Sequence, residues 1–443
     1  MRIFGTDGIR DVANSGWLTP ESLVKLGKTI GLILKPSSQI IIGRDTRISG
    51  KSIMQSLSAG ILPYGINITD AGIIPTPTLS FLTKEKGFDM GIMISASHNP
   101  ADNNGIKIFG KNGLKIPAKT ELLIEKHLLN KLPVKLKNIR PGMINNGDKL
   151  RNLYVNHLLK KAVGPDFSLK GFKIVVDCAN GAASEIAPSV LSSFGAKVIA
   201  INNHPNGKNI NLYCGALHPT VMSRSVVKHQ ADAGFSFDGD ADRVIMSDQK
   251  GIVRDGDFVL SIGAMHLKKK KLLKKNTIVG TIMTNSGLNA YLKKLNINIV
   301  ATPVGDKYVL NKMLSGGYVL GGEPSGHIIF SDYSLSGDGL LTALIILKIV
   351  KEENTSLLTL AKRLTKYPQI LVNVKVKSKL PIKNIKPLMS KAAEVERILG
   401  NEGRLSLRYS GTEPLLRIMV EGKSKKQIEI LAKELANIVK KTL

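Results

Sequence analysis

The sequence predicts an α/β protein with three tandem domains, built on mixed or parallel sheets, and a smaller α+β domain at the C-terminal end. Short runs rich in β-branched residues alternate with segments of helical periodicity, a pattern typical of βαβ units. This alternation begins again near Phe172 and near Thr277. Beyond Tyr367 the expected order becomes strand, helix, two strands and a final helix. Such an order favours a separate α+β domain.

The expected elements follow from these patterns in chain order. Strands are expected at residues 40–42, 90–94, 173–177, 197–201, 234–237, 278–283, 298–302 and 318–320. Amphipathic stretches at 50–62, 183–194, 220–231 and 286–295 are natural crossover helices of a mostly parallel sheet. In the tail, a lysine-rich helix is expected at 425–441, with Ser424 as its N-cap.

The length and composition agree with several domains. The 443 residues exceed one ordinary domain, and the content of 43% hydrophobic and 22% charged residues is that of a globular protein. We place the domains at residues 1–150, 151–255, 256–366 and 367–443. The linkers are expected at 132–141, near Asp255 and at 367–368.

Several classes of protein are excluded by composition. Cys178 and Cys214 are the only 2 cysteines and form no CxxC pair, which excludes zinc ribbons and a disulfide framework and fits a reducing compartment. The start of the chain lacks the apolar segment of a secretory signal. The longest apolar stretch, 340–350, is too short to span a bilayer. We therefore expect a cytoplasmic protein with no membrane partner.

The formal net charge of +29 could indicate nucleic acid, an anionic membrane surface or phosphorylated substrates. The positive charges are spread along the chain. Their densest run, 268–271 followed by Lys274 and Lys275, has no interleaved aromatic residues on which bases could stack. We interpret the lysines mainly as solvated surface and expect no nucleic-acid partner.

Polar loops follow four of the expected strands, where parallel sheets bind their ligands. The first loop, 95–100, reads Ser-Ala-Ser-His-Asn-Pro. The hydroxyl of Ser97 at a strand-to-loop turn, with His98 beside it, has the features of a nucleophile site. Taken alone, such a pair is more often ordinary turn chemistry.

The second loop carries three aspartates in strict alternation, Asp238, Asp240 and Asp242. Their carboxylates would repel one another unless a cation gathered them, and all-oxygen ligation selects a hard ion such as magnesium. An EF-hand does not fit, because its sixth and twelfth positions would be Arg243 and Gln249. A solvated acidic turn is the alternative, but it explains poorly an alternation directly after an apolar strand.

The third and fourth loops carry groups suited to a phosphorylated sugar. The third, 321–327, offers donors and acceptors for hydroxyl groups on Glu323, Ser325 and His327. The fourth, 408–414, combines a guanidinium, hydroxyls and a glycine, which could cradle a phosphate. Each loop by itself could also be a common turn.

Together and in this order, the four loops resemble those of the α-D-phosphohexomutase family, over essentially the whole chain. Residues 4–10, 43–47 and 209–215 are further similar to bacterial members that act on glucosamine phosphates. The resemblance implies four domains around one central cleft, each supplying one loop. It also implies an isomerase that interconverts glucosamine 6-phosphate and glucosamine 1-phosphate, with glucosamine 1,6-bisphosphate as intermediate or activator.

The resemblance further implies a role for each site residue. Ser97 would be held as phosphoserine, and Mg²⁺ would be bound by its phosphoryl oxygen and by the three aspartates of the second loop. Arg10 would stabilise charge on the transferring group, while His98 and Lys107 lie near the reacting oxygens. Sugar contacts are implied for Glu323, Ser325 and His327. The phosphate that does not react would be gripped by Arg408, Ser410, Gly411, Thr412 and Arg417.

Alternatives stay open at this point. A mutase of the same family could prefer mannose or glucose phosphates, and departures from the family pattern at Pro324 and Ala216 lie near the implied substrate contacts. A phosphatase would let water attack the phosphoserine. A basic nucleic-acid-binding protein is the alternative of another class. The expected partner is a small sugar phosphate, and a homodimer stays open.

Overall fold

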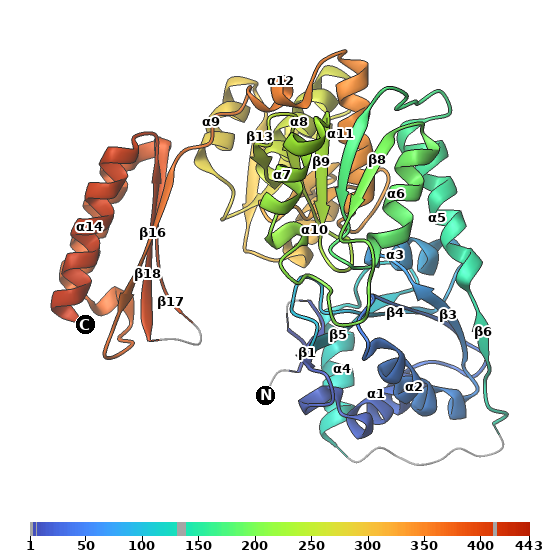
Figure 1. Ribbon diagram of the computed structural model, residues 1–443. Coiled ribbons are helices and arrows are strands. Elements are labelled where there is room, and N and C mark those ends of the chain that lie inside the picture. The colour runs from blue at the N-terminus through green and yellow to red at the C-terminus, as the bar shows by residue number, and fades with distance from the viewer. Residues whose placement is uncertain (1–2, 6, 131–138, 411–413) are drawn as a thin grey trace. The chain divides into compact units, whose positions relative to one another are not determined.

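The structure is a computed structural model of the 443-residue chain, and it describes all residues except 1–2, 6, 131–138 and 411–413 (Figure 1). Two compact units are present. The larger unit comprises Met1–Ile282 and Val300–Ala361, and the smaller comprises Met283–Ile299 and Lys362–Leu443. The larger unit carries the first three sheets, and the smaller unit carries the fourth.

The first sheet has six strands in the order β1-β5-β4-β2-β3-β6. Its strands are β1 (Ile9–Val12), β2 (Gln39–Arg44), β3 (Asn67–Ile73), β4 (Met90–Ile94), β5 (Asn103–Gly110) and β6 (Ile144–Asn146). Its helices are α1 (Pro20–Ile33), α2 (Gly50–Ile61), α3 (Thr76–Glu85) and α4 (Ala118–Leu129). Alternate side chains of β2 face opposite layers: Ile40 and Ile42 pack in the core formed with α1, α2 and α4, whereas Ile41 packs in the core formed with α3.

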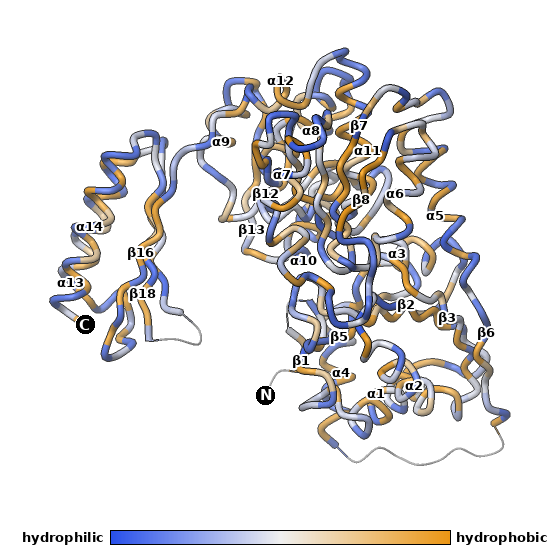
Figure 2. Tube along the Cα trace, viewed as in Figure 1, coloured by the Kyte–Doolittle hydropathy of each residue, from blue (hydrophilic) through white to orange (hydrophobic). Residues whose placement is uncertain are grey.

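The second sheet has five strands in the order β11-β10-β9-β7-β8. The strands are β7 (Lys173–Asp177), β8 (Lys197–Ile201), β9 (Ala233–Phe237), β10 (Val244–Asp248) and β11 (Val253–Arg254), and the helices are α5 (Arg151–His157), α6 (Ala183–Ser193) and α7 (Thr220–His229). Strand β9 is buried along its whole length, and β7 and β8 are largely hydrophobic in Figure 2. Buried strands of this kind are typical of sheets covered by helices.

The third sheet has the order β13-β12-β14-β15. It contains β12 (Thr277–Thr281), β13 (Asn298–Thr302), β14 (Leu320–Gly322) and β15 (Ile328–Phe330), and its chain segment also forms α8 (Gly256–Lys269), α10 (Asp306–Gly316), α11 (Gly339–Glu352) and α12 (Leu357–Ala361). The strand expected at 318–320 is wrong by two residues. Gly321 and Gly322 lie inside β14, and a Cβ at Gly321 would come within 2.6 Å of the sulfur of Met313. The glycines therefore permit close packing and do not open the loop.

The smaller unit is the expected α+β domain. Strands β16 (Gln369–Lys375), β17 (Gly403–Tyr409) and β18 (Leu415–Gly422) form a sheet in the order β16-β18-β17, packed on α13 (Lys386–Leu399) and α14 (Lys425–Thr442). Ser424 caps α14 by accepting a bond from the N–H of Gln427, as expected. Helix α9 (Ser286–Lys294), expected among the crossover helices of the α/β domains, belongs to this unit. Buried Glu421 on β18 accepts bonds from Asn285 and from the N–H of Ser286, at 2.9 and 2.7 Å.

The predicted fold class, three α/β domains followed by a smaller α+β domain, is confirmed. The positions of the domain boundaries stay predictions. Searched helix by helix, the described residues contain no segment long and apolar enough to cross a membrane.

Candidate active site

Three of the four predicted loops lie in the larger unit, and each joins a strand to an antiparallel return strand. The loop of Ser97 joins β4 to β5, the aspartate loop joins β9 to β10, and the loop of Glu323 joins β14 to β15. These loops lie at the ends of hairpins, beyond the last paired residues of the strands, so their side chains can face a ligand. The first two loops meet at Ser97 and Asp238.

Ser97 is fully buried and held in a left-handed backbone conformation, with φ of 54°. Its N–H donates to Ser95 Oγ at 2.9 Å, and Ser95 Oγ donates to Asp45 at 2.6 Å. Its carbonyl accepts bonds from Arg47 Nη2 at 3.0 Å and Asn211 Nδ2 at 2.9 Å. A serine at positive φ is unfavourable unless its surroundings impose it. These contacts on both sides of the backbone fix where the hydroxyl lies.

The Ser97 hydroxyl faces the aspartate loop. Oγ donates to Asp238 Oδ2 at 2.6 Å and lies 3.3 Å from His98 Nδ1. Burial, together with the charges of Arg243 and Arg10, lowers the pKa of His98 to about 4. The imidazole is therefore neutral at pH 7.

Asp238, Asp240 and Asp242 form a compact, buried acidic triad. One carboxylate oxygen from each lies within 4.8 Å of the others. Burial raises the pKa of Asp238, and the charges of Asp242 and Asp240 raise it further. Oδ1 of Asp240 and Oδ1 of Asp242 are buried and accept no hydrogen bond from the described residues. Buried carboxylate oxygens that accept no hydrogen bond are suitable ligands for a hard cation, so the triad fits a metal site.

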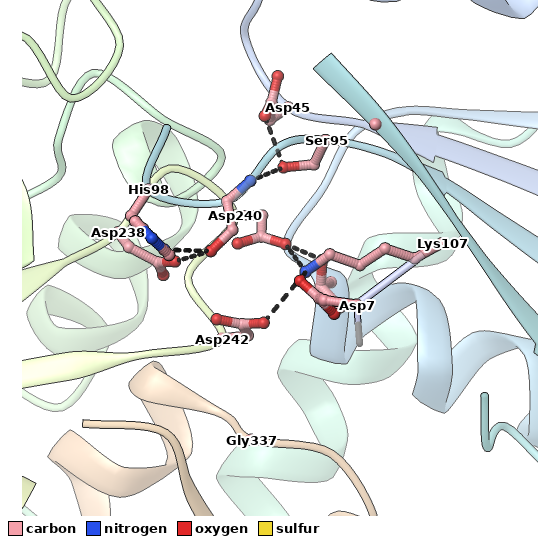
Figure 3. Close-up of polar contacts among 12 residues, drawn as sticks. Asp7, Asp45, Ser95, His98, Lys107, Asp238, Asp240, Asp242 and Gly337 are labelled. Atoms are coloured by element: carbon pink, nitrogen blue, oxygen red, sulfur yellow. Dashed lines mark hydrogen bonds and ion pairs between the residues drawn. The ribbon is translucent and has the colours of Figure 1, made fainter. Parts of the chain in front are cut away.

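Lys107 on β5 supplies positive charge beside the triad. Nζ lies 2.8 Å from Asp240 Oδ2, 3.2 Å from Asp242 Oδ2 and 3.2 Å from Asp7 Oδ2 (Figure 3). Burial lowers the pKa of Lys107, but Asp240 and Asp242 outweigh it and hold the pKa well above its usual range. The ammonium is charged and takes the Oδ2 atoms of both carboxylates. Their Oδ1 atoms accept no hydrogen bond from the described residues, and Arg243 Nε lies 3.8 Å from Oδ1 of Asp242.

Arg10 on β1 lies at the edge of the same cluster. Its Nη2 pairs with Asp7, and its Nη1 donates to Asn99 at 3.4 Å. About a quarter of the Arg10 side chain is exposed, at 25%. The guanidinium is therefore partly open to a ligand.

The side chains of the third predicted loop lie in two different environments. Glu323 Oε1 accepts a bond from the N–H of Gly305 at 2.9 Å, and Ser325 Oγ lies 3.4 Å from Glu323 Oε2. His327 is buried instead, with Nδ1 3.7 Å from Asp242 Oδ2 and Nε2 accepting from the N–H of Gly337 at 3.2 Å. In this structure His327 contacts the acidic triad through Asp242.

The fourth predicted loop lies in the smaller unit, and Gly411 and Thr412 are outside the described residues. Arg408 on β17 and Arg417 on β18 stand directly opposite each other. Arg417 Nη2 lies 3.4 Å from Ser410 Oγ, and Lys379 Nζ donates to the carbonyl of Ser410 at 2.7 Å. Two guanidinium groups on neighbouring strands offer donors suited to an anion.

The sequence reasoning missed several groups that hold this site together. Asp45 and Arg47 stand in the noted segment 43–47, but nothing in their spacing revealed that they clamp the Ser97 loop. Asp7, Lys115 and Asp306 also went unassigned, although Lys115 joins the other two. No local pattern could have indicated such long-range pairs.

Comparison with known families covers nearly the whole chain. Domain families described as phosphoglucomutase/phosphomannomutase alpha/beta/alpha domains I, II and III match residues 1–134, 152–251 and 255–367, and the corresponding C-terminal domain matches 371–438. The chain belongs to the phosphohexomutase family. The predicted resemblance and the prediction of an isomerase of the mutase type are thereby confirmed.

Relatives of this phosphohexomutase include two phosphoglucosamine mutases. One from Alkaliphilus oremlandii is 44% identical over 450 residues, covering 100% of this chain and 99% of the relative. One from Clostridioides difficile is 43% identical over 454 residues, covering 100% and 99%.

Solved structures share the fold of this phosphohexomutase. A phosphoglucomutase/phosphomannomutase family protein from Burkholderia thailandensis has a TM-score of 0.82 at 23% identity, covering 100% of this chain and 97% of that one. An N-acetylphosphoglucosamine mutase from Aspergillus fumigatus, in complex with GlcNAc-6P and magnesium, has a TM-score of 0.66 at 19% identity, covering 99% and 95%.

Proposed function

We propose that this phosphohexomutase is a phosphoglucosamine mutase, which interconverts glucosamine 6-phosphate and glucosamine 1-phosphate. The observation that carries the proposal is the contact of 2.6 Å between the Ser97 hydroxyl and Asp238 of the buried acidic triad. The names of relatives at 43–44% identity support the choice of sugar. The product would feed the synthesis of amino-sugar nucleotides and cell-wall precursors.

The proposed reaction uses Ser97 as a carrier of the phosphoryl group. The bond between phosphorus and Ser97 Oγ breaks as a bond forms to the 1-hydroxyl of glucosamine 6-phosphate, and the hydroxyl proton leaves to a base. The resulting 1,6-bisphosphate turns around, and its 6-phosphoryl group returns to Ser97. The candidate base is His98, which is neutral at pH 7, while Lys107, as a charged ammonium, would position the reacting oxygens or donate a proton.

The acidic triad would hold Mg²⁺ together with the phosphoryl group on Ser97. When bound, Mg²⁺ would neutralise negative charge on the transferring group. Lys107 holds the Oδ2 atoms of Asp240 and Asp242, so it orients both carboxylates before the ion binds. Arg10, with its partly open guanidinium, would stabilise the same developing charge.

Substrate recognition would come from the remaining two loops. Glu323 and Ser325 are proposed to hold sugar hydroxyls, with His327 acting through the triad. Arg408, Ser410 and Arg417, with Gly411 and Thr412, are proposed to grip the phosphate that does not react. Closure of the smaller unit over the substrate would exclude water and protect the phosphoserine from hydrolysis. We also propose a cytoplasmic location, a possible homodimer as assembly and no nucleic-acid partner.

The test compares turnover of glucosamine 6-phosphate, glucose 6-phosphate and mannose 6-phosphate, with magnesium and a trace of the matching bisphosphate. The proposal expects the highest kcat/KM for the glucosamine substrate. A higher value for mannose or glucose phosphate would contradict the choice of sugar and identify a phosphomannomutase or phosphoglucomutase. Phosphate release that matches isomerisation would instead indicate a phosphatase.

A further inference from the structure

Lys115 joins two carboxylates from different parts of the larger unit. It follows β5, where its backbone pairs with Phe109. Its Nζ contacts Asp7 Oδ1, in the segment before β1, and Asp306 Oδ2, in the first turn of α10. We call these three side chains, Asp7, Lys115 and Asp306, the Lys115 bridge.

One end of the Lys115 bridge leads to the cations of the proposed active site. Asp7 uses Oδ1 for Lys115 and Oδ2 for both Arg10 and Lys107, the latter at 3.2 Å. Lys107 in turn contacts Asp240 and Asp242. The orientation of one carboxylate, Asp7, therefore sets where two catalytic cations lie.

The other end also leads to the acidic triad, through His327 and Asp242. Asp306 Oδ2 lies 4.0 Å from His327 Nε2, and His327 Nδ1 lies 3.7 Å from Asp242 Oδ2. All these side chains are largely buried: at most 23% of any of Asp7, Lys115, Asp306 and His327 is exposed. Buried ion pairs resist the loss of one partner, because an uncompensated charge would remain.

We propose that Lys115 and Asp306 are positioning residues. They fix the carboxylate of Asp7, which in turn holds Arg10 and Lys107 in place beside the acidic triad. This inference rests on the proposed function. Lys115 is linked to the triad through Asp7 and Lys107 on one side. On the other side it is linked through Asp306 and His327, so it acts on the reaction through other side chains. The bridge also links the loop after β5 to the first turn of α10.

A cavity beside the Lys115 bridge leaves space for side chains substituted at Lys115 and Asp306. Its volume is about 520 Å³, and its lining includes Lys115, Asp306 and His327. Methionine at position 115 keeps the length of the lysine stem without its charge, and the cavity leaves room for it to adjust. Lys115→Met and Asp306→Asn are therefore expected to fold.

The experiment measures kcat and KM for glucosamine 6-phosphate, with magnesium, and amide hydrogen exchange in the same full-length variants. We expect Lys115→Met and Asp306→Asn each to lower kcat about 10- to 100-fold with KM nearly unchanged, since misplaced catalytic groups cost rate more than binding. The double variant should lose little more than either single one, because both remove the same bridge. Exchange should rise in residues 7–12 and 305–310. Lys115→Arg should restore most of kcat.

Lys111→Met is the matched control. Lys111 lies on the same loop, is 71% exposed and pairs only at 3.8 Å with Asp89, so its kcat should stay within about twofold of wild type. An unchanged kcat, additive losses or unchanged exchange in Lys115→Met would overturn the inference. The exchange measurement does not depend on turnover. A wild-type protein without mutase activity would therefore count against the proposed function, while the exchange pattern still tests the bridge.

Discussion

At the scale of single residues, the site depends on a serine whose backbone conformation is imposed by its neighbours. Ser97 lies at positive φ because Arg47 and Asn211 hold its carbonyl and Ser95 holds its N–H. Arg47 is itself anchored on Asp45 at 3.0 Å with both side chains fully buried. The hydroxyl is thus presented to Asp238 without freedom to turn away.

Replacing this hydroxyl tests the proposed chemistry most directly. Ser97→Ala removes the only atom proposed to carry phosphorus, so mutase activity should fall by at least about 1,000-fold. Intact-mass analysis should show one phosphoryl group on part of the wild-type protein and none on the variant. Ser52→Ala, on the exposed side of α2, should keep both activity and phosphorylation. Full activity of Ser97→Ala would refute the mechanism.

The acidic triad makes a prediction about metal binding and stability. Three carboxylates gathered within 4.8 Å repel one another, so a cation that binds only the folded state stabilises it, by about 2.7 kcal/mol at 100 times its Kd. Mg²⁺ should therefore raise Tm and restore activity lost on treatment with EDTA. Asp240→Asn should show a much smaller rise in Tm. An equal rise in both proteins would place the ion elsewhere.

At the scale of elements, the hairpin is the unit that carries chemistry. Each proposed site loop connects a strand to an antiparallel neighbour: β4 to β5, β9 to β10, β14 to β15 and, in the smaller unit, β17 to β18. In the three hairpins of the larger unit, a rigid pair of strands limits the movement of the loop at its end, so polar residues can be held there.

The sequence predicted the central strands well and the return strands poorly. Expected strands at 90–94 and 173–177 match β4 and β7 residue for residue, because their β-branched runs are buried between helices. The returns β5, β10 and β15 were missed, since the polar loops before them are longer than the two-residue turns that give the Asn-Gly or Asp-Gly hairpin signal.

In the candidate site, too, some features could be predicted from the sequence and others could not. The residue types of Ser97 and the acidic triad could be recognised from the sequence, because each group is local. The supporting contacts could not, since Lys107 and Asp240 are 133 positions apart and Lys115 and Asp306 are 191 apart. Such contacts exist only once the sheets have packed.

The cap of α11 predicts a dependence of stability on pH. Burial raises the pKa of Asp338 to about 6 from its usual 3.8, although it caps the N–H of Leu341 and accepts bonds from Tyr154. The folded state therefore binds more protons than the unfolded state between about pH 4 and 6. The free energy of unfolding should fall by about 3 kcal/mol from this group as the pH rises through that range.

Asp338→Asn isolates this effect, because the amide oxygen can still accept the same bonds and carries no titrating proton. The difference in urea midpoint between wild type and variant should shift in favour of the variant on going from pH 4.5 to pH 7. A difference that is the same at both pH values would contradict the assignment of the raised pKa to Asp338.

At the scale of the whole molecule, the chain passes between its two units three times, after Ile282, before Val300 and after Ala361. The segment Met283–Ile299 is held in the smaller unit through Asn285, Ser286 and the buried carboxylate of Glu421. The smaller unit is therefore larger than the C-terminal domain alone. Movement of this unit would carry α9 with it.

The last prediction concerns the proposed phosphate grip of the smaller unit. Arg408 and Arg417 face each other across β17 and β18, so both guanidinium groups could contact one anion. If the pair binds the phosphate that does not react, Arg417→Gln should raise KM for glucosamine 6-phosphate about 10-fold or more, because hydrogen bonds to charged groups contribute about 1.5–3 kcal/mol. Tm should change little if the role of Arg417 is to bind substrate.

KM should thus rise while Tm changes little, which a merely structural arginine would not show. Lys425→Gln, at the exposed start of α14, is the control for a general loss of positive charge, and it should change neither KM nor Tm. A fall in Tm with unchanged KM in Arg417→Gln would show that the arginine supports the sheet and does not bind substrate. Steady-state kinetics and thermal unfolding of the same preparations decide between the two.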